Sequence, residues 1–226
     1  YKWTPEKGKE VYLEHSGYTG TQPRTEELGS NGLVLNHKGQ LLLCQHGDRR
    51  VALMNASLDN PKAEYITLAN EYKGKKFDSP NDLVVKSNGD IYFTDPPYGL
   101  EKGVNNPSKA APYQGVYKIS KNGEVTLLVD SISRPNGIAF FPGEKSLLIA
   151  NSDGEKPYLY LYDLDKEGLL INGRIFQNER GTDGIKIDKQ GNVFTTGQGG
   201  VWIYNKKGKL LGKIKIDGST SNCAFA

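Results

Sequence analysis

The chain has 226 residues, of which 29 are Lys or Arg and 26 are Asp or Glu, so its formal net charge is +3. Because basic and acidic residues are interspersed, we expect no nucleic-acid partner. No apolar run reaches the roughly 18 residues of a membrane-spanning helix, so we expect no membrane partner either. The length is compatible with one large all-β domain over residues 1–226.

Pairs of short β-rich runs, joined by turns that contain Gly, Asn or Asp, follow one another along the chain. Four pairs begin with Asn or Asp, then Gly or Asp, then an apolar strand, and they lie at residues 31–46, 81–95, 136–151 and 183–197. A second kind of hairpin, with aromatic and β-branched residues alternating with polar ones, is predicted at 1–13, 49–69, 115–129, 158–176 and 200–216. The basic run at 205–215 is interpreted as a solvated outer strand pair.

A unit of four strands therefore recurs, and its starting residues are spaced 39 to 55 residues apart: Asn31, Asn81, Asn136, Asp183 and Asn222. This is the length of a β-propeller blade. The chain carries 19 predicted strands, about five blades' worth, and it starts at the third strand of one blade and stops in the first strand of another. Either a five-bladed or a six-bladed ring would leave a strand edge unpaired. We therefore expect a monomer, or a homodimer formed through the open blade edges.

The first strand of each blade lines the channel of a propeller, so the five starting residues are expected to converge on one rim. The ends of the second strands and the loops after them add His46, Arg49 and Tyr98. Oxygen-rich side chains of this kind suit Ca²⁺ or another hard divalent ion. The local alternative is that Asn-Gly and Asp-Gly form turns or cap loops. Asp82 stands where other repeats have Gly or Cys, and it is assigned to the loop.

Several segments resemble the gluconolactonase branch of the senescence-marker-protein/regucalcin family. They are "CQHGDRRVALM" from Cys44, "SPNDLVVKSNGDIYFTDPPYGL" from Ser79, "RPNGIAFFPGEKSLLIAN" from Arg134 and "GTDGIKID" from Gly181. The resemblance covers essentially the whole chain. It implies a six-bladed propeller that binds one divalent ion at the channel rim and hydrolyses lactones of sugar acids.

The resemblance also implies site residues. Asn136 and Asp183 match the family's metal ligands, Asp183 matches its general base, and Asn81 matches an Asn on the metal or substrate side. A family Glu ligand from an E-G-P motif has no counterpart, so this chain resembles a member that lacks both family ends. With only one acidic ligand, we expect weaker metal binding and low activity.

The predicted function is metal-dependent hydrolysis of a sugar-acid lactone. The ion is Ca²⁺, or alternatively Zn²⁺, Mg²⁺ or Mn²⁺, and its ligands are Asn136, Asp183 and Asn81. Asp183 is the predicted catalytic base. The residues expected to contact the substrate are Asn81, Asn31, His46, Arg49, Tyr98 and Asn222. For Arg49, steering a carboxylate-like product and forming a surface salt bridge are both open.

Two other functions remain open. A five-bladed glycosidase would use the carboxylates of Asp82, Asp95 and Asp183, and a propeller that only binds a ligand or a protein would need no catalytic group. Residue 1 is Tyr and the only methionine is Met54. The native N-terminus is therefore not visible, and both a cytoplasmic and a periplasmic location are expected alternatives.

Overall fold

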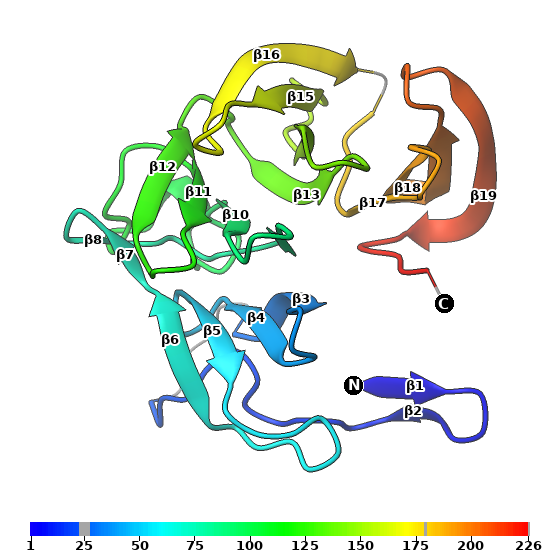
Figure 1. Ribbon diagram of the computed structural model, residues 1–226. Helices are drawn as coiled ribbons and strands as arrows, with labels where there is room; N and C mark the ends of the chain where they lie inside the picture. Colours follow the sequence, from blue (N-terminus) through cyan, green and yellow to red (C-terminus); the bar gives the residue numbers. More distant parts are fainter. Residues whose placement is uncertain (23–27, 179, 226) are drawn as a thin grey trace. The chain divides into compact units, whose positions relative to one another are not determined.

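The structure, a computed structural model, describes residues 1–22, 28–178 and 180–225, and its regular secondary structure is almost entirely β-strand (Figure 1). Contacts within the chain divide it into two compact units. The first unit comprises Tyr1–Pro80 and Pro97–Ala111, and the second comprises Asn81–Pro96 and Pro112–Ala226. The single domain over 1–226 stays a prediction. Among the described residues, no helix has the length and apolar character needed to cross a membrane.

The described residues of the first unit form one four-stranded antiparallel sheet and two short hairpins. The sheet runs in the order β3 (Ser30–Leu35), β4 (Leu41–Gln45), β5 (Arg50–Met54) and β6 (Tyr65–Ala69). The hairpins are β1 (Lys2–Thr4) with β2 (Gly8–Glu10), and β7 (Glu71–Tyr72) with β8 (Lys75–Lys76). A 3₁₀ turn, η1, covers Gly103–Asn105. Sequential strands pair with one another, as expected for a propeller blade.

The second unit holds three antiparallel sheets. The first sheet consists of β9 (Leu83–Val85), β10 (Ile91–Asp95), β11 (Gly115–Ile119) and β12 (Val125–Val129). The second consists of β13 (Pro135–Phe140), β14 (Ser146–Asn151), β15 (Leu159–Leu164) and β16 (Leu170–Gln177). The third consists of β17 (Ile185–Ile187), β18 (Val193–Tyr204) and β19 (Leu210–Ser219). Each sheet begins with one of the predicted first strands, and β13 contacts both β9 and β17.

Strand β18 contains both the second and the third predicted strands of its blade. Gly199 and Gly200 interrupt it with φ angles of 80° and 107°, which L-residues other than glycine rarely adopt. The Thr195 hydroxyl lies 3.4 Å from the carbonyl oxygen of Trp202, whereas seven residues of straight strand would span about 23 Å. β18 therefore folds back on itself, and its two halves supply the two middle strands of the blade.

The three sheets of the second unit pack face to face through apolar side chains. The interface between the first and second sheets contains Tyr92, Val116, Ile138, Leu147 and Ile149. The interface between the second and third sheets contains Ala139, Leu148, Ala150, Leu159, Ile185, Val193 and Tyr204. Successive strand residues point to opposite faces, so Leu147 and Leu148 lie in different interfaces. The second sheet is therefore covered on both faces, as an internal blade is.

The inner strands approach one another closely at Gly137. Its N–H donates to the carbonyl of Asp183 at 2.8 Å, and an added Cβ would lie 2.4 Å from that oxygen. Gly184 is similar, because an added Cβ would lie 2.5 Å from Asn222 Oδ1. Neither glycine has a positive φ. The turn interpretation of Asn136-Gly137 and Asp183-Gly184 is therefore wrong: glycine is needed there because the neighbouring backbone or side chain leaves no room.

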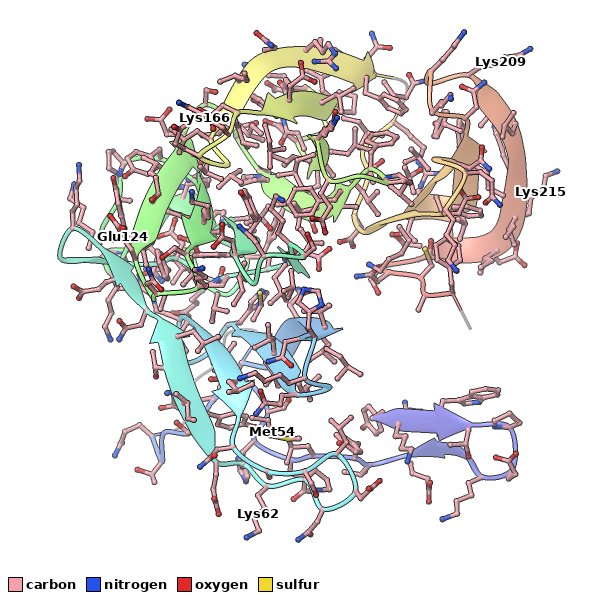
Figure 2. The ribbon with its side chains drawn as sticks, viewed as in Figure 1. Met54, Lys62, Glu124, Lys166, Lys209 and Lys215 are labelled. Atoms are coloured by element: carbon pink, nitrogen blue, oxygen red, sulfur yellow. The ribbon has the colours of Figure 1, made fainter. Side chains whose placement is uncertain are left out.

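Residues 221–225 form no strand, so the strand expected from Asn222 is wrong over this range; Ala226 lies outside the described residues. The backbone here is held by a side chain instead, since the Thr196 hydroxyl donates to the Ser221 carbonyl at 2.9 Å. The short pair β7–β8 was not expected from the sequence. The prediction for the basic run is confirmed: Lys209, directly before β19, and Lys215, within it, are exposed and project outward (Figure 2).

We expect Gly137→Ala to lower the free energy of unfolding by about 1–3 kcal/mol, because the new methyl group must displace the Asp183 carbonyl. Gly212→Ala in β19 is the matched control, since open space surrounds that position and its φ is not positive. The control should be neutral or stabilising by up to about 1 kcal/mol. Urea denaturation of both variants measures the difference, and an equal loss in both would contradict the close approach.

Candidate functional site

A buried threonine joins the starts of the first two inner strands of the second unit. The Thr94 hydroxyl donates to the Asn136 carbonyl at 2.7 Å and accepts the Asp82 N–H at 3.2 Å. The Thr94 carbonyl in turn accepts the Asn81 N–H at 2.8 Å. Thr94 is fully buried. The main chains at Asn81 and Asn136, two of the predicted metal ligands, are therefore held together by one side chain.

The next junction, meaning the link between the starts of two neighbouring inner strands, is made without a hydroxyl group. In the register of the second sheet, Ala150 takes the place that Thr94 has in the first. The Gly137 N–H donates directly to the Asp183 carbonyl at 2.8 Å. This direct bond requires the close approach that only glycine permits. It places Asp183 next to the strand that Asn136 begins.

A third junction follows at the last sheet. The Thr196 hydroxyl accepts the Gly184 N–H at 2.8 Å and donates to the Ser221 carbonyl. Beside it, Asn222 Oδ1 accepts a hydrogen bond from Lys186 Nζ at 3.0 Å. The second unit thus brings together Asn81, Asn136 and Asp183 at linked ends of neighbouring strands, with Asn222 in the irregular segment beside the last junction.

The side-chain oxygens of two residues in this cluster, Asn81 and Asn136, receive no hydrogen bond from the described residues. Asn136 donates through Nδ2 to Ser152 Oγ at 3.2 Å, and no described residue donates to its Oδ1. The side chain of Asn81 is nearly buried and makes no hydrogen bond with any described residue. Asp183 is half-buried.

Oxygen atoms without donors are the ligand type that a hard divalent ion prefers. Within 1–22, 28–178 and 180–225, no group of three or more His, Cys, Asp or Glu residues has a spacing that would hold a metal. The donor set therefore fits a hard ion in atom type, but Asp183 is its only partly exposed carboxylate.

Asp82 is a fully buried carboxylate at the entrance of β9. Its Oδ1 accepts the Leu83 N–H at 2.9 Å, while Oδ2 has no hydrogen-bond partner among the described residues. Burial raises the pKa of Asp82 to about 6, the positive charge of Lys186 opposes that shift, and the negative charge of Asp183 adds to it. Asp82 precedes β9, which starts at Leu83, so its assignment to the loop is confirmed. The equivalent positions in the other repeats hold Gly or Cys, whereas this repeat has a buried carboxylate there.

The other predicted substrate residues belong to the first unit. His46 follows β4 and is buried, and burial lowers its pKa to about 4, so its ring is neutral at pH 7. Tyr98 is half-buried and precedes Gly99, where an added Cβ would lie 2.8 Å from His46 Cβ. Tyr98 is therefore one residue away in sequence from the close contact between Gly99 and His46, which is called the His46 corner below. Asn31 is exposed on β3.

Arg49 is buried and bound by protein groups. Its Nε donates to the Phe77 carbonyl at 2.6 Å, and its Nη1 donates to the Ser108 carbonyl at 3.1 Å. Its Nη2 lies 4.0 Å from Asp78 Oδ1. The expected surface salt bridge is therefore a buried one, because the guanidinium turns into the first unit; product steering stays a prediction.

His46 and Asp82 predict opposite effects of pH on stability. The folded pKa of His46 lies below its ordinary 6.5, so the unfolded chain binds the extra proton and stability falls as pH drops from 6.5 to about 4. The folded pKa of Asp82 lies above its ordinary 3.8, so stability falls as pH rises from about 4 to about 6.

We therefore expect Asp82→Asn to make the slope of unfolding free energy against pH more positive between pH 4 and 6.5, and His46→Gln to make it more negative. Each change should amount to at most about 3 kcal/mol over the window. Urea titrations at several pH values measure these slopes. Curves of both variants that run parallel to the wild type would contradict the two pKa shifts.

The chain resembles known lactone hydrolases along its length. Residues 1–226 match the family described as "SMP-30/Gluconolactonase/LRE-like region". A gluconolactonase from Zymomonas mobilis is 36% identical over 238 residues, which cover 99% of this chain and 66% of the relative. Lactonohydrolase oryL from Aspergillus oryzae is 26% identical over 195 residues, which cover 75% of this chain and 44% of the relative.

A solved structure of a gluconolactonase from Xanthomonas campestris superposes with a TM-score of 0.76 at 31% identity, and the match covers 88% of this chain and 66% of that one. The chain thus spans about two thirds or less of the length of the relatives it matches. The all-β propeller class is confirmed, whereas the number of blades stays a prediction. On the match over all 226 residues, the chain belongs to the SMP-30/gluconolactonase/LRE-like family.

Proposed function

We propose that the protein hydrolyses lactones of sugar acids with the help of a divalent metal ion. The observation that carries this proposal is the set of linked strand ends in the second unit, which gathers Asn81, Asn136 and Asp183 in a chain of this family. The relatives named gluconolactonase and lactonohydrolase support a lactone as the substrate class.

Asp183 is the proposed general base. It accepts a proton from the attacking water, whose oxygen adds to the lactone carbonyl carbon. The bond between that carbon and the ring oxygen then breaks, and Asp183 returns the proton to the leaving oxygen. The products are a carboxylic acid and a hydroxyl group on one open chain. Asn81 and Asn222 are proposed to orient sugar hydroxyls, as are Asn31 and His46 of the first unit, with Tyr98 as a wall for the ring.

The proposed metal ligands are Asn136, Asp183 and Asn81. A bound Ca²⁺, or Zn²⁺, Mg²⁺ or Mn²⁺, would supply polarisation of the lactone carbonyl and stabilise the negative charge that develops on its oxygen. The Ser152 hydroxyl accepts a hydrogen bond from the Asn136 amide nitrogen, so the amide oxygen would be the atom that binds the ion. Two neutral amides and one carboxylate balance little of a 2+ charge, so we propose weak binding by this chain.

The glycosidase alternative has less support. It requires at least two carboxylates that reach a substrate, but Asp82 and Asp95 are both buried. A binding function without catalysis would be marked by exposed apolar side chains, and Leu211, Ile214 and Ile216 on β19 are exposed. The named relatives favour the enzyme over this alternative.

Asp183→Asn should lower kcat for δ-gluconolactone by at least about 100-fold, because the proton acceptor is lost while the shape is kept. Asp217→Asn is the matched control, since it makes the same change at an exposed position of β19. Acid release in a pH-stat, corrected for spontaneous hydrolysis, measures both rates. A variant of Asp183 within threefold of the wild type would refute the assignment.

Calorimetric titration with Ca²⁺ tests the metal part separately. We expect the 226-residue chain to bind Ca²⁺ with a Kd well above micromolar, because charged ligands set the affinity of such sites. Micromolar binding would contradict the proposed donor set, whereas Asn136→Ala should weaken whatever binding is seen.

A further inference from the structure

The loop between β10 and β11 is long and contains only the turn η1. Its residues Pro97–Ala111 belong to the first unit, although both flanking strands belong to the second. Loops of this length without regular structure are uncommon in compact domains and are usually either functional or disordered. This loop begins with Tyr98, a predicted substrate residue, and its middle, residues 101–105, is mostly exposed.

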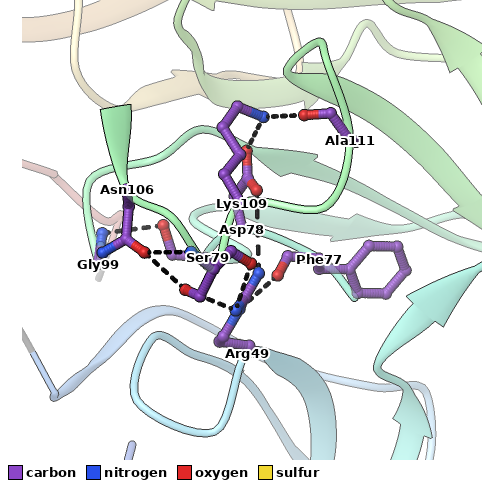
Figure 3. Close-up of polar contacts among 9 residues, drawn as sticks. Arg49, Phe77, Asp78, Ser79, Gly99, Asn106, Lys109 and Ala111 are labelled. Carbon is purple, nitrogen blue, oxygen red and sulfur yellow. Dashed lines mark hydrogen bonds and ion pairs between the residues drawn. The ribbon is translucent and has the colours of Figure 1, made fainter. Parts of the chain in front are cut away.

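The C-terminal end of the loop is held by a buried ion pair. Lys109 Nζ lies 2.5 Å from Asp78 Oδ2 and donates to the Ala111 carbonyl at 2.6 Å (Figure 3). The side chains of Lys109 and Asp78 are 8% and 1% exposed. Few lysines are this buried, and each such group loses its hydration on folding.

Arg49 binds the same end of the loop from the other side. Its Nη1 donates to both the carbonyl and the hydroxyl of Ser108. Its Nε donates to the Phe77 carbonyl (Figure 3). Arg49 adopts φ 58°, a conformation that costs a non-glycine residue energy. The guanidinium therefore links the loop to the residue that precedes Asp78.

The N-terminal end of the loop is held by the residue that follows Asp78. The Gly99 N–H donates to Ser79 Oγ at 2.8 Å. An added Cβ at Gly99 would lie 2.7 Å from Ser79 Cβ and 2.8 Å from His46 Cβ. The tripeptide Phe77–Ser79 thus binds both ends of the loop, and the N-terminal contact sets Gly99, the residue after Tyr98, beside His46.

We propose that Asp78 and Lys109 are positioning residues for the lactone reaction: their ion pair fixes the loop at 97–111 and thereby holds Tyr98 at the His46 corner. This inference rests on the proposed function. A buried ion pair gains less stability than an apolar pair of similar volume, because both charges lose their hydration. Its directional hydrogen bonds instead define one position for the loop.

Hydrogen exchange of Lys109→Met tests the anchoring without reference to activity. We expect the amides of residues 98–108 to exchange about tenfold faster or more, with β4 and β5 unchanged, because the loop opens locally. Lys102→Met is the matched control, since it removes the same charge from an exposed position in the same loop. Lys109→Arg should restore much of the protection.

Faster exchange across the whole first unit, or equal exchange in the Lys109 and Lys102 variants, would overturn the anchoring. The reaction supplies the second readout: Lys109→Met should raise KM for δ-gluconolactone about tenfold, with kcat within about threefold, because Asp183 is untouched. Unchanged KM in a variant whose loop has opened would overturn the positioning role. A wild type without lactonase activity would refute the proposed function, and the lactone part of this inference with it, while exchange still decides the anchoring.

Discussion

Hydrogen bonds between the ends of neighbouring inner strands determine where the polar residues of the second unit lie. Each bond runs from an N–H at the start of one strand to a carbonyl at the start of the next, either through a threonine hydroxyl or directly. Both Thr94 and Thr196 are fully buried, and a buried N–H or carbonyl left without a partner costs about 1–3 kcal/mol. The alternatives to this arrangement are therefore costly, and Asn81, Asn136 and Asp183 share a fixed geometry.

Much of the fold was predictable because its signals are local. Alternating apolar and polar residues, and Gly-containing turns, mark strands through the neighbours of each residue in sequence, and the predicted hairpins correspond to β1–β6 and β9–β19. The roles of Gly137 and Gly184 were not predictable in this way. Their side-chain space is taken by atoms of the next strand, and a sequence does not show how closely two backbones approach.

The positions of site residues were predictable where strand topology alone determines which residues are neighbours. Equivalent strand starts in adjacent blades must be neighbours, and this places Asn136 beside Asp183. The burial of Asp82 and Arg49 depends instead on contacts with residues that are distant in sequence. Arg49 meets Ser108, which is 59 residues away in sequence, and Lys109 meets Asp78 across 31 residues. Nothing near Arg49 in sequence distinguishes a buried guanidinium from an exposed one.

The segments of the two units alternate along the chain, so the order of synthesis affects when each unit can fold. A ribosome makes Arg49 and Asp78 before Lys109 and Ser108, and the strands β9 and β10 of the other unit come between them. Domains generally fold as units during synthesis, but the first unit can be completed only after part of the second has been made. A fragment ending at residue 80 would contain Asp78 and Arg49 without Lys109, the partner of the buried acid. Neither unit can therefore be isolated by a single cut or by circular permutation, because their segments alternate along the chain; the two segments of one unit would have to be joined directly.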